Sequence, residues 1–416
     1  MSIRADVVVL GAGIVGLCCA LHLQRRGREV VLIDRADGVG LETSYGNAGL
    51  IQPDGMIPIA FPRDLRTFVS YALNRRRDCY YHMSALAELA PALFKYWQLS
   101  HPDAMANSLM GNLPLFENSV PEHFALAQEA GAIEMFRPTG WTRAFRKEKT
   151  FAAHLRKLVV SASYGVAAEQ LSGDQLRSLE PHLNSSLIGA IRFTGQLSLA
   201  SPVKLSQAYR QLFTSLGGIF TKGEARTIEA KSRSHWQVAS DRGVIEADAA
   251  VVCFGPWTED LLRPLGYPLP FFVKRGYHLH FKAREEAELH NPVSDVDGGY
   301  SLTPMEEGIR LNTGVEFARR DDPPSVVQLN RVIPWARDFF PMGERVERQT
   351  WVGSRPCLPD MLPIIGPLPR HPGLWVAAGH AHHGLTLAAS TARLLAEMMS
   401  GETPYVDPRP YRVERF

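Results

Sequence analysis

The sequence predicts an α/β protein with two domains: a Rossmann-like domain that is discontinuous in the chain, and an α+β domain built on a mainly antiparallel sheet. Three observations lead to this prediction. A complete strand–helix–strand unit stands at the N-terminus, a second strand enters a glycine-rich turn and a helix near the C-terminus, and segments of alternating apolar and polar residues lie between them. The first two patterns are typical of a parallel sheet covered by helices, and the third is typical of an antiparallel sheet.

The N-terminal unit begins with a continuous apolar run, Val7–Leu10, as expected of a parallel strand buried on both faces. The run stops at Gly11–Gly16, which has the GxGxxG spacing. Apolar residues then recur at helical intervals until Gly27 ends the helix, and a second apolar run, Val30–Ile33, leads to Asp34. A GxGxxG match alone would be weak, but the strand, loop, helix and terminal acid together predict a dinucleotide-binding unit.

Each part of this unit has a chemical role. Gly11 permits the tight turn, Gly13 lets the backbone approach a pyrophosphate, and Gly16 lets the helix pack closely on the strand. The pyrophosphate then lies on free N–H groups at the positive end of the helix, and Asp34 accepts hydrogen bonds from the adenosine ribose. Glycines that serve only a tight turn are the alternative. We expect nucleotide contacts from Gly11, Gly13, Ile14, Val15, Gly16, Asp34 and Arg35.

The rest of the chain favours FAD over NAD. No regular βαβ repeat follows Asp34; the next segment is the small-residue polar loop Glu42–Gly49. Near the other end, the strand Leu374–Ala378 enters the loop Gly379–Gly384 and then an apolar helix. The N-terminus of such a helix stabilises the negative charge that reduced flavin develops near N1 and the C2 carbonyl. We expect FAD contacts from Thr43, Ser44, Asn47, Gly255, Gly379, His380, Gly384, Leu385 and Thr386.

Composition argues against several other classes of protein. The formal net charge of +2, with no basic region that interleaves aromatic residues, gives no reason to expect nucleic-acid binding. None of the five cysteines falls in a CxxC pair, which argues against zinc ribbons, iron–sulfur clusters and disulfide frameworks and favours a cytoplasmic protein. Residues Met1–Asp6 lead directly into the first strand, so we expect no signal peptide, and no apolar stretch is long enough to span a membrane.

Between the two glycine-rich units lie helical and alternating segments. Residues Asp64–Leu99 are helical in tendency, whereas 271–281, 299–303 and 309–315 alternate apolar and polar residues as in an antiparallel sheet. Such a sheet would form a substrate domain laid over the cofactor. We therefore expect an FAD-binding domain at 1–60, 196–260 and 356–416, and a substrate-binding domain at 61–195 and 261–355.

Four further segments follow the N-terminal unit in an order found in a known group: Glu42–Gly49 (ETSYGNAG), Val273–Leu279 (VKRGYHL), Trp351–Gly366 (WVGSRPCLPDMLPIIG) and Gly379–Thr386 (GHAHHGLT). Together they resemble the D-amino acid dehydrogenase branch of the D-amino acid oxidase and glycine oxidase superfamily, over essentially the whole chain. The RGYH and GHxHxGLT variants look closer to the dehydrogenases proposed for cyclic substrates such as cis-4-hydroxy-D-proline. The D-alanine-type members read KGYS and GHxxxGWT instead.

The resemblance implies a glutathione-reductase-like FAD domain and electron transfer to a quinone or another acceptor. It places the backbone near Ala225 at the adenine and makes Arg355 the carboxylate-binding arginine. Cys357 does not match the flavin-linked cysteine of the sarcosine oxidases, so FAD is expected to be held non-covalently. The implied reaction oxidises a D-amino acid or a cyclic D-imino acid, such as D-proline or D-hydroxyproline, by hydride transfer from Cα to flavin N5. Its product is an imine or 2-oxo acid.

An amino acid substrate needs an anchor for its carboxylate. Arg355 is the first candidate, because its planar fork can donate two hydrogen bonds; a salt-bridged arginine is the alternative. Arg275 is a candidate second partner, with a solvated strand arginine as its alternative. Tyr277 and Tyr300 are candidate aromatic walls of the site, with hydroxyl groups that orient the substrate. The alternative is that both rings only pack between sheet and helix. His382 is a candidate polar contact or proton acceptor with a pKa near neutrality. The alternative is a solvent-exposed loop histidine.

Two other groups of residues have side chains that can bind a metal ion or an anionic surface. The cluster His380, His382 and His383 does not predict a metal site, because no acidic or cysteine ligand lies close in sequence. Arg75–Arg77 lie beside an amphipathic stretch and are candidates for peripheral contact with the inner face of the cytoplasmic membrane. A solvated helix end is the alternative for these arginines.

Three other functions stay open. A flavin-dependent 2-hydroxy acid dehydrogenase would also anchor a carboxylate, but it needs a base for the hydroxyl proton. A second alternative is that the chain is the FAD subunit of a hetero-oligomeric amine or opine oxidase and is inactive without its partner. A regulatory dinucleotide-binding protein is disfavoured by the flavin-side loop and by Arg355.

Overall fold

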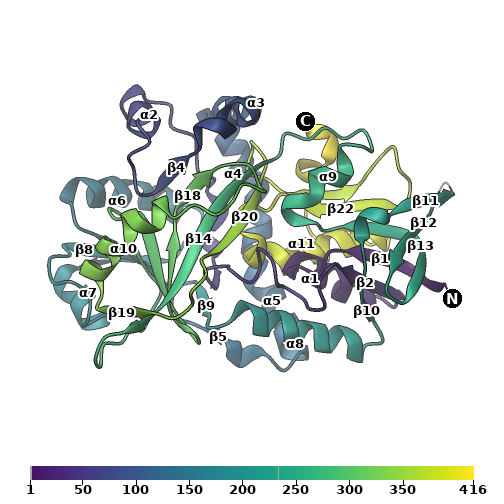
Figure 1. The fold of residues 1–416 in the computed structure, drawn as a ribbon, viewed down its shortest axis with the longest axis horizontal. Coiled ribbons are helices and arrows are strands. Elements are labelled where there is room, and N and C mark those ends of the chain that lie inside the picture. The colour runs from purple at the N-terminus through teal and green to yellow at the C-terminus, as the bar shows by residue number, and fades with distance from the viewer. Residues whose placement is uncertain (1, 233) are drawn as a thin grey trace.

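Two lobes form the molecule in the computed structural model, which describes residues 2–232 and 234–416. Figure 1 shows the N-terminal strands and the C-terminal helix α11 in the right-hand lobe, and the long strand β14 in the left-hand lobe. Each lobe has a large sheet of its own. The predicted α/β class, with one partly parallel and one mainly antiparallel sheet, is confirmed.

The first sheet has a parallel centre. Strand β1 (Ile3–Leu10) lies between β2 (Val30–Asp34) and β13 (Gly243–Val252), and β10 (Ile219–Lys222) and β22 (Leu374–Ala378) extend the parallel set on either side. Because these strands run in one direction, their carboxyl ends meet at one edge of the sheet. Antiparallel strands complete it: β11 (Glu229–Ser232), β12 (His235–Ser240) and β21 (Ile364–Pro367).

Both faces of the first sheet are covered, which explains why its strands are continuously apolar. Alternate residues of β1 enter two separate cores. Helices α1 (Ile14–Gln24), α8 (Pro202–Ser215) and α11 (Gly384–Met399) pack on one face. The other face packs against α9 (Thr258–Leu262) and the C-terminal residues around Val413.

Strand β14 (Phe272–Ala283) is the centre of the second sheet. It pairs with β20 (Trp351–Cys357) on one side and with β17 (Gly308–Thr313) and β18 (Val315–Phe317) on the other, always antiparallel. Only the pairs β15–β6 and β18–β4 are parallel among the described strands of this sheet. Its other strands are β4 (Cys79–Tyr81), β6 (Trp141–Phe145), β7 (Ala168–Ser172), β8 (Gly189–Phe193), β15 (Val293–Asp295), β16 (Tyr300–Met305) and β19 (Met342–Arg345).

Helices and one small sheet fill the remaining space. Helix α10 (Val327–Phe339) packs on the second sheet, and α6 (Glu148–Ala162) and α7 (Gly173–Leu179) lie against its far strands. Helices α4 (Pro102–Glu117) and α5 (Ser119–Glu129) pack against α11. The small sheet consists of β3 (Leu50–Ile51), β9 (Leu197–Leu199) and β5 (Phe136–Arg137).

The predicted helical segment Asp64–Leu99 is wrong as one element. The chain forms α2 (Leu65–Ala72), turns at Asn74 with φ 52°, adds β4 to the edge strand β18, and only then begins α3 (Met83–Leu99). Local helical propensity is therefore overridden by strand pairing with a partner more than 200 residues away in the chain. None of the residues of α2 is buried.

The strands divide between the sheets roughly as the predicted domains divide the chain. The first sheet takes its strands from residues 3–34, 219–252 and 364–378, and the second from 79–81, 141–193 and 272–357. Strand β20 crosses the predicted boundary between residues 355 and 356. The domain boundaries themselves stay a prediction.

Candidate active site

A cavity of about 390 Å³ runs from the carboxyl edge of the first sheet to the inner strands of the second. At one end it is lined by the glycine loop after β1 and by the end of β2. At the other end it is lined by residues of β14 and β20 and by the loop that precedes α11. Residues from distant parts of the chain therefore share one site between the two sheets.

The glycine loop brings the N-terminus of α1 close to the cavity. Gly11 has φ +103°, and a Cβ there would lie 2.6 Å from the Cys253 carbonyl oxygen. A Cβ on Gly16 would lie 2.0 Å from the Gly11 carbonyl oxygen, so only glycine allows the helix to start here. Ile14 N donates to Ser44 Oγ at 3.1 Å, and the first turn of α1 holds no acidic residue. This end suits an anion such as a pyrophosphate.

Asp34 is held at the end of β2 by the backbone. Its carboxylate accepts from Ala12 N at 2.7 Å and from Ala36 N at 2.9 Å. Burial raises the pKa of Asp34, while these two hydrogen bonds oppose that effect. Arg35 lies over the Trp257 ring at 4.4 Å, and Trp257, Ala225 and Gly255 line the same end of the cavity. Fixed acceptors beside an aromatic wall suit a ribose and an adenine.

A second helix N-terminus faces the middle of the cavity. Gly384 and Leu385, the first residues of α11, line it, and His383 at the helix start makes no side-chain cap. His380 also lines this region, and its Nε2 lies 3.0 Å from Thr391 Oγ1. Burial lowers the pKa of His380 to about 4, so this ring is neutral at physiological pH. The positive charge here therefore comes from the helix dipole.

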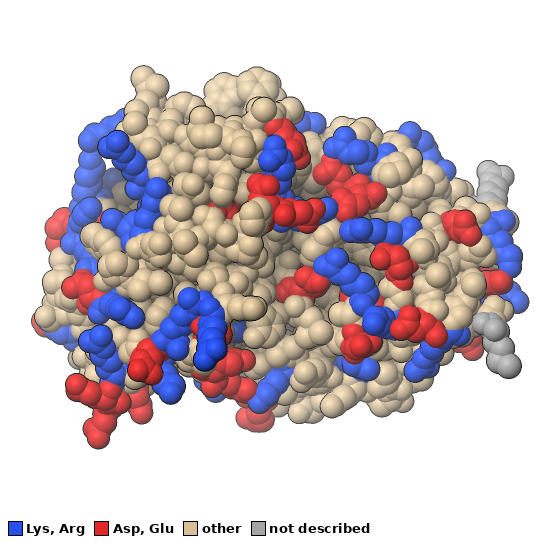
Figure 2. All heavy atoms as spheres, viewed as in Figure 1, with Lys and Arg blue, Asp and Glu red and all other residues tan. Residues whose placement is uncertain are grey.

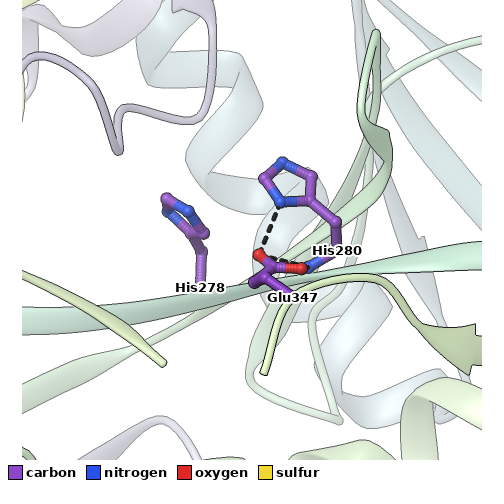
Figure 3. A group of neighbouring side chains, drawn as sticks. All are labelled: His278, His280 and Glu347. Carbon is purple, nitrogen blue, oxygen red and sulfur yellow. Dashed lines mark hydrogen bonds and ion pairs between the residues drawn. The ribbon is translucent and has the colours of Figure 1, made fainter. Parts of the chain in front are cut away.

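The loop 43–49, which lines the cavity, is fixed from below by the second sheet. Arg310 donates to the carbonyl oxygens of Tyr45 and Asn47 at 3.2 and 2.6 Å. Its Nε donates to His280 Nε2 at 2.8 Å, which leaves the His280 proton on Nδ1, 2.7 Å from Glu347 (Figure 3). Arg310, His280 and Glu347 thus form one chain of hydrogen bonds beneath the loop.

His278, His280 and Glu347 also lie close enough to suggest a metal site, since their ligand atoms lie within 4.8 Å of one another (Figure 3). Both nitrogens of His280 are already engaged, one of them by the buried Arg310 guanidinium. A divalent cation would have to displace that guanidinium and accept a positive neighbour. We therefore assign this group to loop positioning. Trp351 completes the support, because it stacks on His278 with ring centroids 4.6 Å apart.

Arg355 lies at the far end of the cavity on β20. Its Nη1 makes two long contacts, 3.4 Å to the Arg275 carbonyl oxygen and 3.3 Å to that of Gly314. It forms no ion pair with any residue that the structure describes. Burial lowers the pKa of Arg355 from its usual value, a sign that its charge lacks compensation. A half-buried guanidinium in this state suits a ligand carboxylate.

His382 lines the cavity near Arg355, but not with the predicted pKa near neutrality. Burial, followed by the charges of His383, Arg355, Lys274 and Arg143, holds the pKa of His382 well below its usual value. The ring is therefore neutral at physiological pH. It offers a hydrogen-bonding nitrogen to a substrate without adding positive charge.

Tyr277, Arg275 and Tyr300 do not line the cavity, contrary to the sequence-based expectation. Successive residues of a strand face opposite sides, and Tyr277 and Arg275 lie on the far side of β14, where both contact the buried Glu316. Tyr300 donates to Asp295 at 2.9 Å inside the core of the second sheet. The hydroxyl groups of both tyrosines are thus engaged away from the site.

Most of the other predicted residues line the cavity, and three support it from behind. Gly16 packs α1 on β1, Gly379 packs against Leu358, and Thr386 Oγ1 bonds the backbone of Gln52 and Leu50. The predicted residues that line the cavity are Gly11, Gly13, Ile14, Val15, Asp34, Arg35, Thr43, Ser44, Asn47, Ala225, Gly255, His380, Gly384, Leu385, Arg355 and His382.

The cavity lining also includes residues that the sequence did not predict, among them Trp257, Lys274, Asn312 and Trp351. Asn312 Nδ2 is buried and has no hydrogen-bond partner among the described residues, so it is a free donor at the wall of the site. Lys274 directly precedes the RGYH segment. Its pairing with Arg355 across β14 and β20 places it on the same face of the sheet, and this pairing is the signal that identifies it. The sequence carries no comparable signal for Asn312.

The chain matches the model of a protein family described as FAD dependent oxidoreductase, over residues 6–398. It belongs to this family. A D-amino acid dehydrogenase of Granulibacter bethesdensis is 30% identical, with 99% of each chain covered. A D-amino-acid oxidase of Bradyrhizobium diazoefficiens is 28% identical over 99% of this chain and 98% of the relative. Among solved structures, glycine oxidase of Geobacillus kaustophilus has a TM-score of 0.75 at 21% identity, covering 100% of this chain and 99% of the other.

The flavoenzyme's cofactor is FAD, and the cavity fits it. The loop Gly11–Val15 suits the pyrophosphate, Asp34 and Trp257 suit the adenosine, and the loop 43–49 with the start of α11 suits the flavin. Cys357 is fully buried and is not part of the cavity lining, and non-covalent binding of FAD stays a prediction. The sequence predicted residues that line this part of the cavity because they lie on contiguous segments; their contacts with FAD stay a prediction.

Two glycine variants should separate packing from cofactor binding. Gly16→Ala places a methyl group 2.0 Å from the Gly11 carbonyl oxygen, so we expect the free energy of unfolding to fall by about 1–3 kcal/mol. Gly13→Ala meets only Ser44 Oγ at 3.6 Å, so the fold should be kept, but its methyl group blocks the approach of the pyrophosphate.

Chemical denaturation of the FAD-free protein and the ratio of FAD to protein after gel filtration check this pair. A Gly16→Ala protein as stable as the wild type, or a Gly13→Ala protein that retains full FAD, would contradict the assignment.

Proposed function

We propose that this flavoenzyme is a dehydrogenase that oxidises the Cα–N bond of a D-amino acid. The observation that carries the proposal is Arg355, a half-buried guanidinium that lines the flavin end of the cavity and forms no ion pair among the described residues. The full-length likeness to proteins named D-amino acid dehydrogenase and D-amino-acid oxidase supports it. When bound, FAD supplies the acceptor for the two electrons that leave Cα with its hydrogen.

The residues around the substrate end would bind and orient the amino acid and favour its neutral amine, whose proton is lost to solvent. Arg355 would hold the α-carboxylate with two parallel hydrogen bonds and so present the Cα–H bond to the flavin end. The positive charges of Arg355 and Lys274 would lower the pKa of a neighbouring ammonium group, which favours the neutral amine needed for oxidation. Neutral His382 would accept a hydrogen bond from that amine. As the hydride leaves, the nitrogen lone pair forms the C=N bond, and water converts the imine to a 2-oxo acid.

Cyclic D-imino acids such as D-proline and D-hydroxyproline are a second substrate group within this proposal. The GHxHxGLT variant supports them, since His382 lies at the substrate end. The RGYH variant does not, because Arg275 and Tyr277 face away from the cavity. We propose a quinone or another carrier as the electron acceptor.

An anaerobic screen of the purified holoenzyme tests the reaction class. D-Alanine, D-proline and cis-4-hydroxy-D-proline are compared with their L-forms and with D-lactate, and loss of flavin absorbance is recorded. We expect bleaching by at least one D-amino or D-imino acid and none by D-lactate. Bleaching by D-lactate alone would indicate 2-hydroxy acid oxidation. No bleaching until a partner protein is added would indicate the FAD subunit of a hetero-oligomer.

The pH dependence should come from the substrate and not from His382. The pKa of His382 lies well below 6.5, so the ring is already neutral at pH 6 and binds no proton at higher pH. We expect kcat/KM to rise with pH as the substrate amine loses its proton, with the same midpoint in the wild type and in His382→Asn. An acid limb near pH 6.5 that is present in the wild type and absent from His382→Asn would contradict this assignment.

We also propose peripheral contact with the inner face of the cytoplasmic membrane, through α2 and α3 more than through the predicted arginines. Arg76 pairs with Asp78, and Arg77 donates to the Asp297 and Gly298 carbonyl oxygens, which leaves Arg75 as the exposed member of Arg75–Arg77. None of the helices in the described part of the chain is long and apolar enough to cross a membrane.

The surface over α2 and α3 is apolar instead. Leu65 is 76% exposed and Met83 72% exposed, and Phe68, Leu73 and Phe94 are also exposed. Figure 2 shows mainly uncharged side chains over these two helices, with lysine and arginine side chains beside α2. An exposed apolar helix face flanked by positive charge is typical of a protein that lies on an anionic bilayer.

Sedimentation with vesicles that contain an anionic phospholipid tests this contact. We expect the wild type to pellet with the vesicles at low salt and Phe68→Glu to stay in the supernatant, because a charge on the apolar face opposes insertion. Val159→Glu, at an exposed valine of α6, is the matched control and should pellet like the wild type. Wild-type protein that stays in the supernatant would contradict the proposal.

A further inference from the structure

Lys274 is a buried cation in the wall of the cavity. It lies on β14 directly opposite Arg355 on β20, so the two side chains leave the sheet on the same face. Both residues line the cavity. Lys274 is only 6% exposed, although lysine is the residue type that is least often buried without a partner.

The ammonium group of Lys274 has neutral neighbours. It donates to Tyr96 Oη at 3.1 Å, lies 4.0 Å from Met361 Sδ, and stands over the Tyr96 and Phe272 rings at 4.4 and 5.6 Å. In the part of the chain that the structure describes, no carboxylate lies within ion-pair distance of it. The tyrosine oxygen accepts one of its three N–H donors and the Met361 sulfur is a weak acceptor for a second, so one donor and the positive charge remain without a partner among the described residues.

The acidic residues that line the cavity cannot neutralise this charge. They are Asp34, Glu42 and Glu224, and all three belong to the end of the cavity around β2, Arg35 and Ala225. The opposite end holds two cations, Lys274 and Arg355, and no acid among its described residues. A buried or half-buried charge without a counter-ion is unfavourable, so a site with two such cations favours a ligand that carries two negative charges.

We propose that Lys274 binds a second carboxylate of the substrate, so that the enzyme prefers an acidic D-amino acid such as D-glutamate or D-aspartate. This inference rests on the proposed function. Arg355 takes the α-carboxylate, because its planar fork matches two oxygens and fixes the orientation of Cα. Lys274 takes the side-chain carboxylate as a compact point charge on a flexible stem, which tolerates more than one side-chain length.

A hydroxyl group on the substrate would satisfy a donor of Lys274 but leave its charge uncompensated. The hydroxyl of cis-4-hydroxy-D-proline is such a group, so it is the natural competitor for this position. A carboxylate satisfies the donors and the charge together. The unpaired charge of Lys274 is therefore the reason to favour the anionic group.

The test compares substrates that differ only in this charge. Anaerobic flavin reduction is measured with D-glutamate against D-glutamine and with D-aspartate against D-asparagine. A charge-assisted hydrogen bond at a buried site predicts that the wild type favours each acid over its amide by about 10- to 100-fold in the second-order rate constant. Lys274→Met should remove most of that ratio, whereas Lys274→Arg should keep part of it.

Lys282→Met is the matched control, since Lys282 lies on the same strand with an exposed side chain, and it should keep the wild-type ratio. Retained FAD absorbance and an unchanged melting temperature check that each variant is folded. A wild-type ratio near one, or a ratio that Lys274→Met leaves unchanged, overturns the proposal. So does a Lys274→Met effect confined to cis-4-hydroxy-D-proline against D-proline. Failure of every D-amino acid to reduce the wild type would instead contradict the proposed function itself.

Discussion

The pairing of β14 with β20 is the interaction on which the site depends. Its register places Lys274 opposite Arg355 and Gly276 opposite Gly353. The two glycines leave the space that the neighbouring side chains occupy: a Cβ on Gly276 would lie 2.3 Å from Arg355 Nη2, and one on Gly353 would lie 2.0 Å from the Trp351 ring. This strand pair thus places Lys274 and Arg355 at the cavity, and its two glycines leave room for the neighbouring side chains.

The same strand pair supports the cofactor end. Further along β14, His278 stacks on Trp351 of β20, and His280 orients Arg310, which holds the loop 43–49 through two backbone carbonyl oxygens. Lys274 and Arg355, which face the substrate, and the loop 43–49, which faces the flavin, are therefore held by the same pair of strands. A change that shifts β14 against β20 would displace both the two cations and the loop 43–49. The orientation of the substrate and the position of the cofactor are therefore coupled through this strand pair.

The sequence predicted most of the residues of Gly11–Asp34 that line the cavity, because this segment is contiguous and its spacing alone indicates the local geometry. It failed at Tyr277 and Tyr300 because the face that a strand residue takes depends on the register of partners far away in the chain. A shift of one residue along β14 exchanges Tyr277 and Arg275 for Lys274 and Gly276 at the cavity. The helix predicted across residues 64–99 failed for a related reason, because β4 forms only when β18 is present to pair with it.

Lys274 and Arg355, two cations without an ion-pair partner among the described residues, lie at the flavin end of the cavity, and we propose that they bind carboxylate groups. Titration of the oxidised holoenzyme with an unreactive carboxylate, such as benzoate, measures this directly through the change in the flavin absorbance spectrum. The account predicts saturable binding to the wild type and a dissociation constant about 10- to 100-fold higher for Arg355→Met, since a charge-assisted bidentate contact is lost. Equal dissociation constants for the two proteins would contradict it.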